Sequence, residues 1–140
     1  MKKKALLAIL LLGIAGVSIG VYMFYKPHQS ILNEKPAFTA SAADFAGEYE
    51  KGEKEANAKY LGKIIEVEGV VSEKSLDEKG MLNVTLQGID LSGVSCVFDK
   101  KHQNNVMKYK EGDKIKVKGI CTGVLMDVVL VDCVLTEEKN

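Results

Sequence analysis

GKIIEVEGV at residues 62–70 and GDKIKVKGI at residues 112–120 are two copies of one pattern. In each copy, two glycines enclose a strand-like alternation of apolar and charged residues. The charged residues are Glu66 and Glu68 in the first copy and Lys116 and Lys118 in the second. Opposite charges on facing positions help to fix the pairing of two neighbouring strands. We therefore expect these two strands to be neighbours that close one small β-barrel.

The N-terminus combines three lysines with a long uncharged run. Lys2, Lys3 and Lys4 precede Ala5–Tyr25, whose 21 residues carry no charge. A helix of that length measures about 31 Å, enough to cross the hydrocarbon core of a bilayer. We predict that residues 1–25 are cytoplasmic lysines followed by a transmembrane anchor. A cleaved signal peptide is the alternative, but its apolar stretch is usually shorter and a small-x-small site follows it closely.

The lysines also predict the orientation of this anchor. Three lysines and the α-amino group precede the span, whereas only Lys26 and Lys35 follow it before the outer domain. This asymmetry places the N-terminus in the cytoplasm and the remainder outside. Residues 26–38 contain two prolines and no apolar periodicity, which predicts an extended tether. Residues 39–140 are enough for one small domain.

The charge of the outer domain limits its partners. The whole chain is neutral, but residues 39–140 carry fourteen lysines and eighteen acids, a net charge of −4. The chain has no arginine and no tryptophan. A mildly acidic surface without arginine does not favour a polyanionic partner.

The outer domain is expected to begin with an amphipathic helix at residues 41–60. Ser41 can cap it, and an apolar stripe with helical spacing follows. The stripe consists of Phe45, Tyr49, Gly52, Ala56 and Tyr60. Its regular aromatics indicate packing rather than a cofactor site, and Gly52 could divide the helix in two.

Five strands are expected after this helix. They cover residues 63–74 (bent at Gly69), 82–86, 94–99, 114–121 and 127–135, with a helix or turn at 100–109 before the fourth. This order, with a long first strand, is that of an OB-fold, a five-stranded Greek-key barrel. The predicted fold is therefore mainly β, with a barrel at 62–136.

Several segments together resemble one known family. They are KPH after the span, EANAKY at 55–60, VSCVFD at 94–99 and GICTGVLMDVVL at 119–130. The chain resembles the tRNA-anticodon-binding-like OB-fold family of small membrane-tethered bacterial proteins. The resemblance implies the fold and the anchoring, but it implies no shared activity, because fold does not fix function.

The three cysteines are expected to be buried thiols of the barrel core. Cys96, Cys121 and Cys133 each share a strand face with apolar residues. A tight hairpin would place Cys121 opposite Asp127 and Cys133 opposite Ile115, too far apart for a disulfide. A bulged hairpin, or pairing of Cys96 across the barrel, would escape that objection, so oxidation outside the cytoplasm stays open.

The sequence predicts neither an enzyme nor a metal or cofactor site. His28 and His102 are isolated, whereas a metal site needs several ligands at regular spacing. Glu66 and Glu68 could form an acid/base pair, but an exposed ladder with the facing lysines explains them better. There is no Cys-x-x-Cys, phosphate-binding loop or nucleophile elbow.

Nucleic-acid binding, which the fold suggests, lacks the expected surface chemistry. OB-folds that hold single strands use a basic groove and exposed aromatics that stack on bases. Among the predicted strands only Phe98 is aromatic, and its alternation with Val94 and Cys96 points it inward. We therefore do not expect nucleic acid as a partner, and a single-stranded nucleic acid or an oligosaccharide is kept only as the alternative ligand.

The loop between the last two strands is the candidate ligand-binding site. Its residues are Thr122, Gly123, Val124, Leu125, Met126 and Asp127. OB-folds commonly bind ligands at this loop, and an apolar run is unusual in a turn. Either these side chains cover the barrel, or they form a contact surface for a protein or another envelope component. We expect a membrane-anchored, extracytoplasmic binding module.

Overall fold

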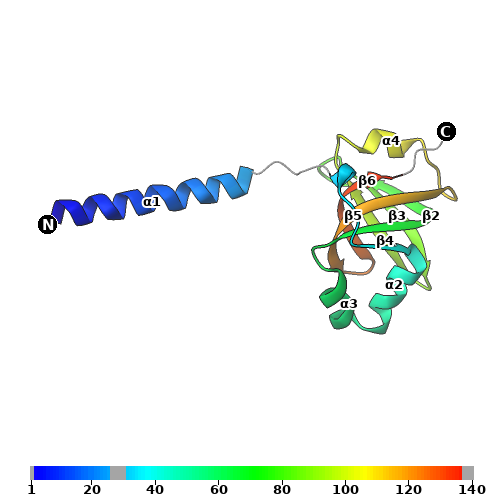
Figure 1. Cartoon of the computed structure of the whole chain (residues 1–140). Helices are drawn as coiled ribbons and strands as arrows, with labels where there is room; N and C mark the ends of the chain where they lie inside the picture. Colours follow the sequence, from blue (N-terminus) through cyan, green and yellow to red (C-terminus); the bar gives the residue numbers. More distant parts are fainter. Residues whose placement is uncertain (1, 26–30, 137–140) are drawn as a thin grey trace.

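The structure, a computed structural model, describes residues 2–25 and 31–136 (Figure 1). The helices are α1 (Lys2–Tyr25), the 3-10 helix η1 (Ile31–Asn33), α2 (Ala42–Lys51), α3 (Glu53–Tyr60) and α4 (Gln103–Met107). The strands are β1 (Phe38–Ser41), β2 (Ile64–Leu76), β3 (Leu82–Ile89), β4 (Ser92–Phe98), β5 (Lys114–Val124) and β6 (Val128–Leu135).

Strands β2 to β6 form the closed barrel of an OB-fold. The strand order is β1-β2-β3-β4-β6-β5, and β2 also pairs with β5, which closes the sheet on itself. Strands β4 and β6 run parallel, and the other barrel pairs are antiparallel. β2 serves two neighbours in turn, with Ile64–Val70 on β5 and residues from Val71 onward on β3. The predicted fold class is confirmed.

The charge-inverted repeat is the seam of this barrel. Glu66 lies opposite Lys118 and Glu68 opposite Lys116, as expected for neighbouring strands. Lys116 Nζ lies 4.0 Å from a Glu66 carboxylate oxygen and 3.9 Å from one of Glu68. Lys118 behaves differently, because it is 5% exposed and donates to the main-chain carbonyls of Leu32 (2.9 Å) and Glu34 (2.6 Å). Lys116 therefore takes part in the charge ladder, whereas Lys118 acts as a clamp that holds residues 32–34 against the barrel.

The glycines of the repeat have two different physical roles. The first glycine of each copy, Gly62 (φ +77°) or Gly112 (φ +92°), has the positive φ that favours glycine at the turn into the strand. The second glycine lies where no side chain fits. A methyl group at Gly69 would lie 2.8 Å from Ala42 Cβ, and one at Gly119 would lie 2.6 Å from Cys133 Sγ.

The expected helix is divided into α2 and α3 at Gly52. Ser41 caps α2, since its Oγ accepts a hydrogen bond from the Asp44 amide at 3.1 Å. The aromatic members of the stripe are buried and contact one another through ring edges or stacked faces. α2 packs on β3 and β4, so the two helices cover one end of the barrel while α4 lies at the other (Figure 1).

Residues 31–38 have more regular structure than the sequence indicated. Residues 26–30 of the expected tether lie outside the described residues. Residues 31–38 were expected to be an extended spacer, yet Ile31 is 3% exposed and Phe38 begins β1, which pairs in parallel with β2. The short strand lacks a long alternating pattern, and Ile31 and Leu32 are an isolated apolar pair between polar residues, so neither segment gave a recognisable signal.

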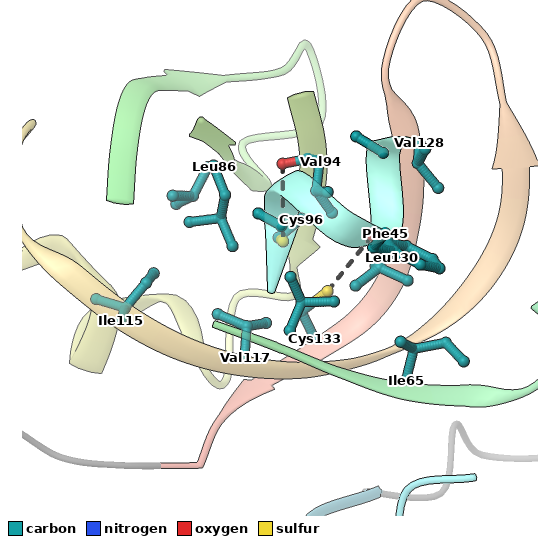
Figure 2. Close-up of a cluster of buried hydrophobic side chains, with 14 of the residues drawn as sticks. Phe45, Ile65, Leu86, Val94, Cys96, Ile115, Val117, Val128, Leu130 and Cys133 are labelled. Atoms are coloured by element: carbon teal, nitrogen blue, oxygen red, sulfur yellow. Dashed lines mark hydrogen bonds between the residues drawn. The ribbon is translucent and has the colours of Figure 1, made fainter. Parts of the chain in front are cut away.

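The core combines inward side chains of all five barrel strands with those of α2. Figure 2 shows Phe45, Ile65, Val117, Leu130 and Cys133 among the buried side chains of this cluster. Phe98 is fully buried, as its alternation predicted. Burial of these side chains supplies the main driving force for folding.

The close approach of Gly119 to Cys133 leads to a testable prediction. Gly119→Ala should destabilise the protein by about 1–3 kcal/mol, because the added methyl group overlaps Cys133 Sγ and lies 2.9 Å from Leu130 Cβ. Gly47→Ala is the matched control, since Gly47 lies within α2 and a methyl group there would be 3.7 Å from Ile89 Cδ1. This control should stabilise by about 0.5–1 kcal/mol. Equal unfolding free energies for the two variants, measured by denaturant titration, would contradict this account of the repeat.

Candidate binding surface

The β5–β6 loop is a tight turn held by its own hydrogen bonds. β5 ends at Val124 and β6 begins at Val128. The Leu125 amide donates to the Asp127 carbonyl at 3.1 Å, and Thr122 Oγ1 donates to the Val129 carbonyl at 3.3 Å. Gly123 (φ +108°) lies at an irregularity of the hairpin register. The conformation of the loop is therefore fixed by the chain itself.

The apolar residues of this loop divide into one that packs and two that do not. Val124 is partly buried and packs against the core cluster, so the expectation of structural cover fits this residue. Leu125 is 89% exposed and Met126 88% exposed. These two side chains are presented to the exterior by a backbone that is otherwise well bonded.

A second turn lies beside the first and adds another exposed leucine. β4 and β6 run parallel with Val94 opposite Val128, so the turns that precede them lie at the same end of the barrel. Asp127 Oδ1 accepts a hydrogen bond from the Gly93 amide at 2.9 Å and joins the two turns. Leu91, in the second turn, is 101% exposed. Leu91 was not among the predicted site residues, although a leucine between Asp90 and Ser92 in a turn was a usable signal.

Leu61 extends this surface toward α3. Leu61 is half-exposed, and its Cδ1 would lie 3.6 Å from a methyl group placed on Gly123. We refer to Leu61, Leu91, Leu125 and Met126 as the apolar end of the barrel. Lys59 and Lys63 lie two residues to either side of Leu61 in the sequence, and their ammonium groups lie 5.3 and 5.5 Å from the centre of the Phe38 ring.

The outer face of β3 and β4 is the other surface that an OB-fold can use for a ligand. Here it carries small polar groups, including Ser95, whose Oγ donates to Asn83 Oδ1 at 2.8 Å. Phe38, which was expected to precede the helix outside any strand, lies on β1 and is half-buried, with its ring edge-on to that of Tyr60 and the two ring centres 5.1 Å apart. Phe38 lies on β1, outside the barrel strands, so the β3–β4 face gains no stacking platform from it.

A shallow hollow of about 280 Å³ lies between α2 and α3. It is lined by Glu48, Lys51, Gly52, Glu55, Ala56 and Lys59. Lys59 Nζ lies 3.3 Å from a Glu48 carboxylate oxygen. Hydrogen bonding from Tyr60, and from Lys59, lowers the pKa of Glu48. The Glu48 carboxylate therefore stays ionised and paired, which suits a structural ion pair better than proton transfer.

The three thiols are buried and poorly suited to nucleophilic chemistry. The hairpin is bulged, so Cys121 lies opposite Leu130 rather than Asp127, and Cys133 approaches Gly119 rather than Ile115. The Tyr49 hydroxyl and Cys121 Sγ are 3.3 Å apart. Burial, and next the neighbouring thiol of Cys96, raises the pKa of Cys133 well above its ordinary value. A thiolate, the reactive form, is thereby disfavoured.

The histidines do not assemble a metal site in the described part of the chain. His102 Nδ1 lies 2.9 Å from Asp99 Oδ1, while His28 falls outside the described residues. Among residues 2–25 and 31–136, histidine, cysteine and carboxylate side chains form no group that could hold a metal ion.

Comparison with known proteins supports the family and the fold. The family model that matches the chain is tRNA_anti-like, over residues 1–135. A Klebsiella pneumoniae lipoprotein, named for an assumed nucleic-acid-binding role, is 16% identical with a TM-score of 0.59. The match covers 71% of this chain and 92% of that one. The asparaginyl-tRNA synthetase of Entamoeba histolytica is 14% identical with a TM-score of 0.44, covering 76% of this chain and 25% of the synthetase. No curated protein sequence matches the chain.

Burial of the thiols predicts how they react. In the folded protein at about pH 8, none of the three cysteines should be alkylated by a maleimide at the rate of a free thiol, because all three are buried and out of reach of the reagent, and burial also keeps Cys133 protonated. Denaturant should expose all three, as counted by mass spectrometry. The raised pKa of Cys133 means that stability is retained below the thiol pKa of the unfolded chain, about 8.5, and falls above it. Rapid alkylation of a native cysteine would contradict this picture.

Proposed function

Because the chain belongs to the tRNA_anti-like family, we propose that it is a membrane-anchored, extracytoplasmic OB-fold binding module that acts by contact rather than by catalysis. Its partner is a protein or another component of the cell envelope. One observation carries the proposal: Leu125 and Met126 are almost fully exposed on a turn whose backbone is held by hydrogen bonds. Exposed apolar groups that gather on a rigid element are typical of contact surfaces.

The anchoring part of the proposal rests on α1. Lys2–Tyr22 is long and apolar enough to cross a membrane, and none of it is buried against the rest of the protein. A signal sequence near the N-terminus would meet the same criteria. The length of the apolar run and the three lysines before it favour a retained anchor with its N-terminus in the cytoplasm.

The binding part rests on the contrast between the loop and the strand faces. Val124 packs inward and fixes the base of the turn, and Asp127 ties the turn to Gly93. Leu125 and Met126 are left outside. An anchored protein works at high local concentration toward other envelope components, so a small apolar contact can suffice.

The alternative function is binding of a single-stranded nucleic acid or an oligosaccharide by the outer face of β3 and β4. Asn83 is partly exposed on that face and accepts a hydrogen bond from the buried Ser95 hydroxyl, and this oriented side-chain amide is the observation that favours it. Against nucleic acid stand the net negative charge of the outer domain, the absence of arginine from the sequence and the burial of Phe98. The name of the Klebsiella lipoprotein keeps this alternative worth testing.

Topology can be tested by labelling in intact cells. Gln29→Cys places a thiol just after the membrane helix, and we expect a membrane-impermeant maleimide to label it without lysis, because the lysine asymmetry puts this segment outside. The unsubstituted protein is the control, since its own thiols are buried. Labelling that requires lysis would place the domain in the cytoplasm and would favour nucleic acid as the ligand.

The binding surface can be tested by photo-crosslinking in cells. A photoreactive phenylalanine analogue at Leu125 should form adducts with an envelope component, and the mass of the adduct would identify its class. Met107, which is half-exposed on α4 at the opposite end of the barrel, is the control position. An equal yield at the two positions would contradict the proposed surface, and an adduct with nucleic acid would favour the alternative.

A further inference from the structure

We infer that the apolar end of the barrel rests on the bilayer in which α1 is embedded. Leu91, Leu125 and Met126 would enter the interfacial layer of the outer leaflet. The envelope component that this surface contacts is thus lipid. The inference rests on the proposed function, because it requires α1 to be a membrane span.

The most exposed aliphatic side chains outside α1 gather at one end of the barrel. Outside α1, the described large apolar residues with the highest exposure are Leu91 (101%), Met126 (88%) and Leu125 (89%), and all three occupy two adjacent turns. Leu76 and Met107, toward the other end, are only about half-exposed. The surface is a pair of protruding turn tips, a shape that enters a soft interface more readily than it receives a protein side chain.

The length of the tether permits this contact. Only residues 26–30 separate Tyr25, the end of α1, from Ile31, which is buried against the barrel. Six peptide steps span roughly 20 Å at full extension. Lys118, which holds η1, is seven residues from Leu125 along β5, about 24 Å in an extended strand. A barrel lying on its side can therefore bring the apolar end to the bilayer without exceeding its tether.

The charges near the apolar end are compatible with a lipid surface. Lys63 follows Leu61 by two residues and can face the phosphates of anionic lipids, whereas Lys59 pairs with Glu48. Asp127 accepts a hydrogen bond from the Gly93 amide. Asp90 lies next to Leu91 and is the remaining acid of the two turns. Lysines beside aliphatic tips are typical of segments that lie on a membrane surface.

Covalent attachment to α1 also lowers the affinity that this contact needs. The tether holds the barrel at the bilayer, so insertion of a few side chains is an intramolecular step with a high effective concentration. A contact too weak to recruit a free domain can therefore fix the orientation of an anchored one.

The absence of tryptophan from the chain permits a direct test in the full-length protein. Single variants Met126→Trp, Met107→Trp and Ile14→Trp would be reconstituted in phosphatidylcholine–phosphatidylglycerol vesicles containing a phosphatidylcholine brominated in its acyl chains. Tryptophan emission at position 126 should shift to shorter wavelength and be quenched by bromine. Position 107 is the matched control, because it also replaces a methionine but lies at the opposite end of the barrel. Its emission should be unshifted and unquenched. Emission at position 14, within α1, should be strongly quenched.

Each outcome is decisive. Quenching at 126 but not at 107 supports the bilayer contact. Quenching at 14 with equal, weak quenching at 126 and 107 overturns it, while the anchored binding module stands and a protein partner is favoured. Absence of quenching at 14 shows that α1 does not span the bilayer and overturns both proposals. Circular dichroism of the three variants confirms that each retains the fold, as the exposure of the replaced side chains leads us to expect.

Discussion

Closure of the barrel by β2 and β5 is the constraint on which the other features depend. It joins segments that are far apart in the sequence, with Val67 opposite Val117. It places Gly119 so close to Cys133 that β5 and β6 can pack without a side chain between them. It also leaves Lys118 facing η1, so the N-terminal segment docks only on a closed barrel. Closure is expected to be a late event in folding, because the chain loses the entropy of closing a long loop before the contacts between β2 and β5 can form.

The helices and strands that could be predicted from the sequence are those with long and regular residue patterns. The repeat, with its alternating residues and opposite charges, was sufficient to place β2 beside β5. The amphipathic stripe was sufficient for α2 and α3, including the division at Gly52. β1 was missed because four residues, half of them exposed, carry no usable periodicity. Its parallel pairing with β2 is a tertiary effect.

The hairpin between β5 and β6 shows a different limit. Strict pairing from the turn predicted one register, but two irregularities shift it, and Asp132 adopts a positive φ (52°) within β6. Bulges of this kind follow from how the strands curve around the core, which local residue types do not reveal. The loop was recognised as unusual, yet its division into an inward Val124 and outward Leu125 and Met126 depended on that register. Leu91 lies beside Leu125 and Met126 only because β4 and β6 pair in parallel, and the sequence does not show that these two turns are adjacent.

The clamp formed by Lys118 has a mechanical consequence. The ammonium group holds the carbonyls of Leu32 and Glu34, and Ile31 is buried beside them, so η1 is fastened to the side of the barrel at the N-terminal entry to the domain. A force applied to the barrel through α1 would reach η1 and β5 before it reached β1 or α2. A pull along the chain would first strain a few short-range contacts at the clamp, while the strand ladder behind it stayed unloaded. If the Lys118 hydrogen bonds broke, the residues of η1 would be added to the segment that connects α1 to the barrel. The barrel itself would stay closed, so this connection could extend under tension without unfolding the domain.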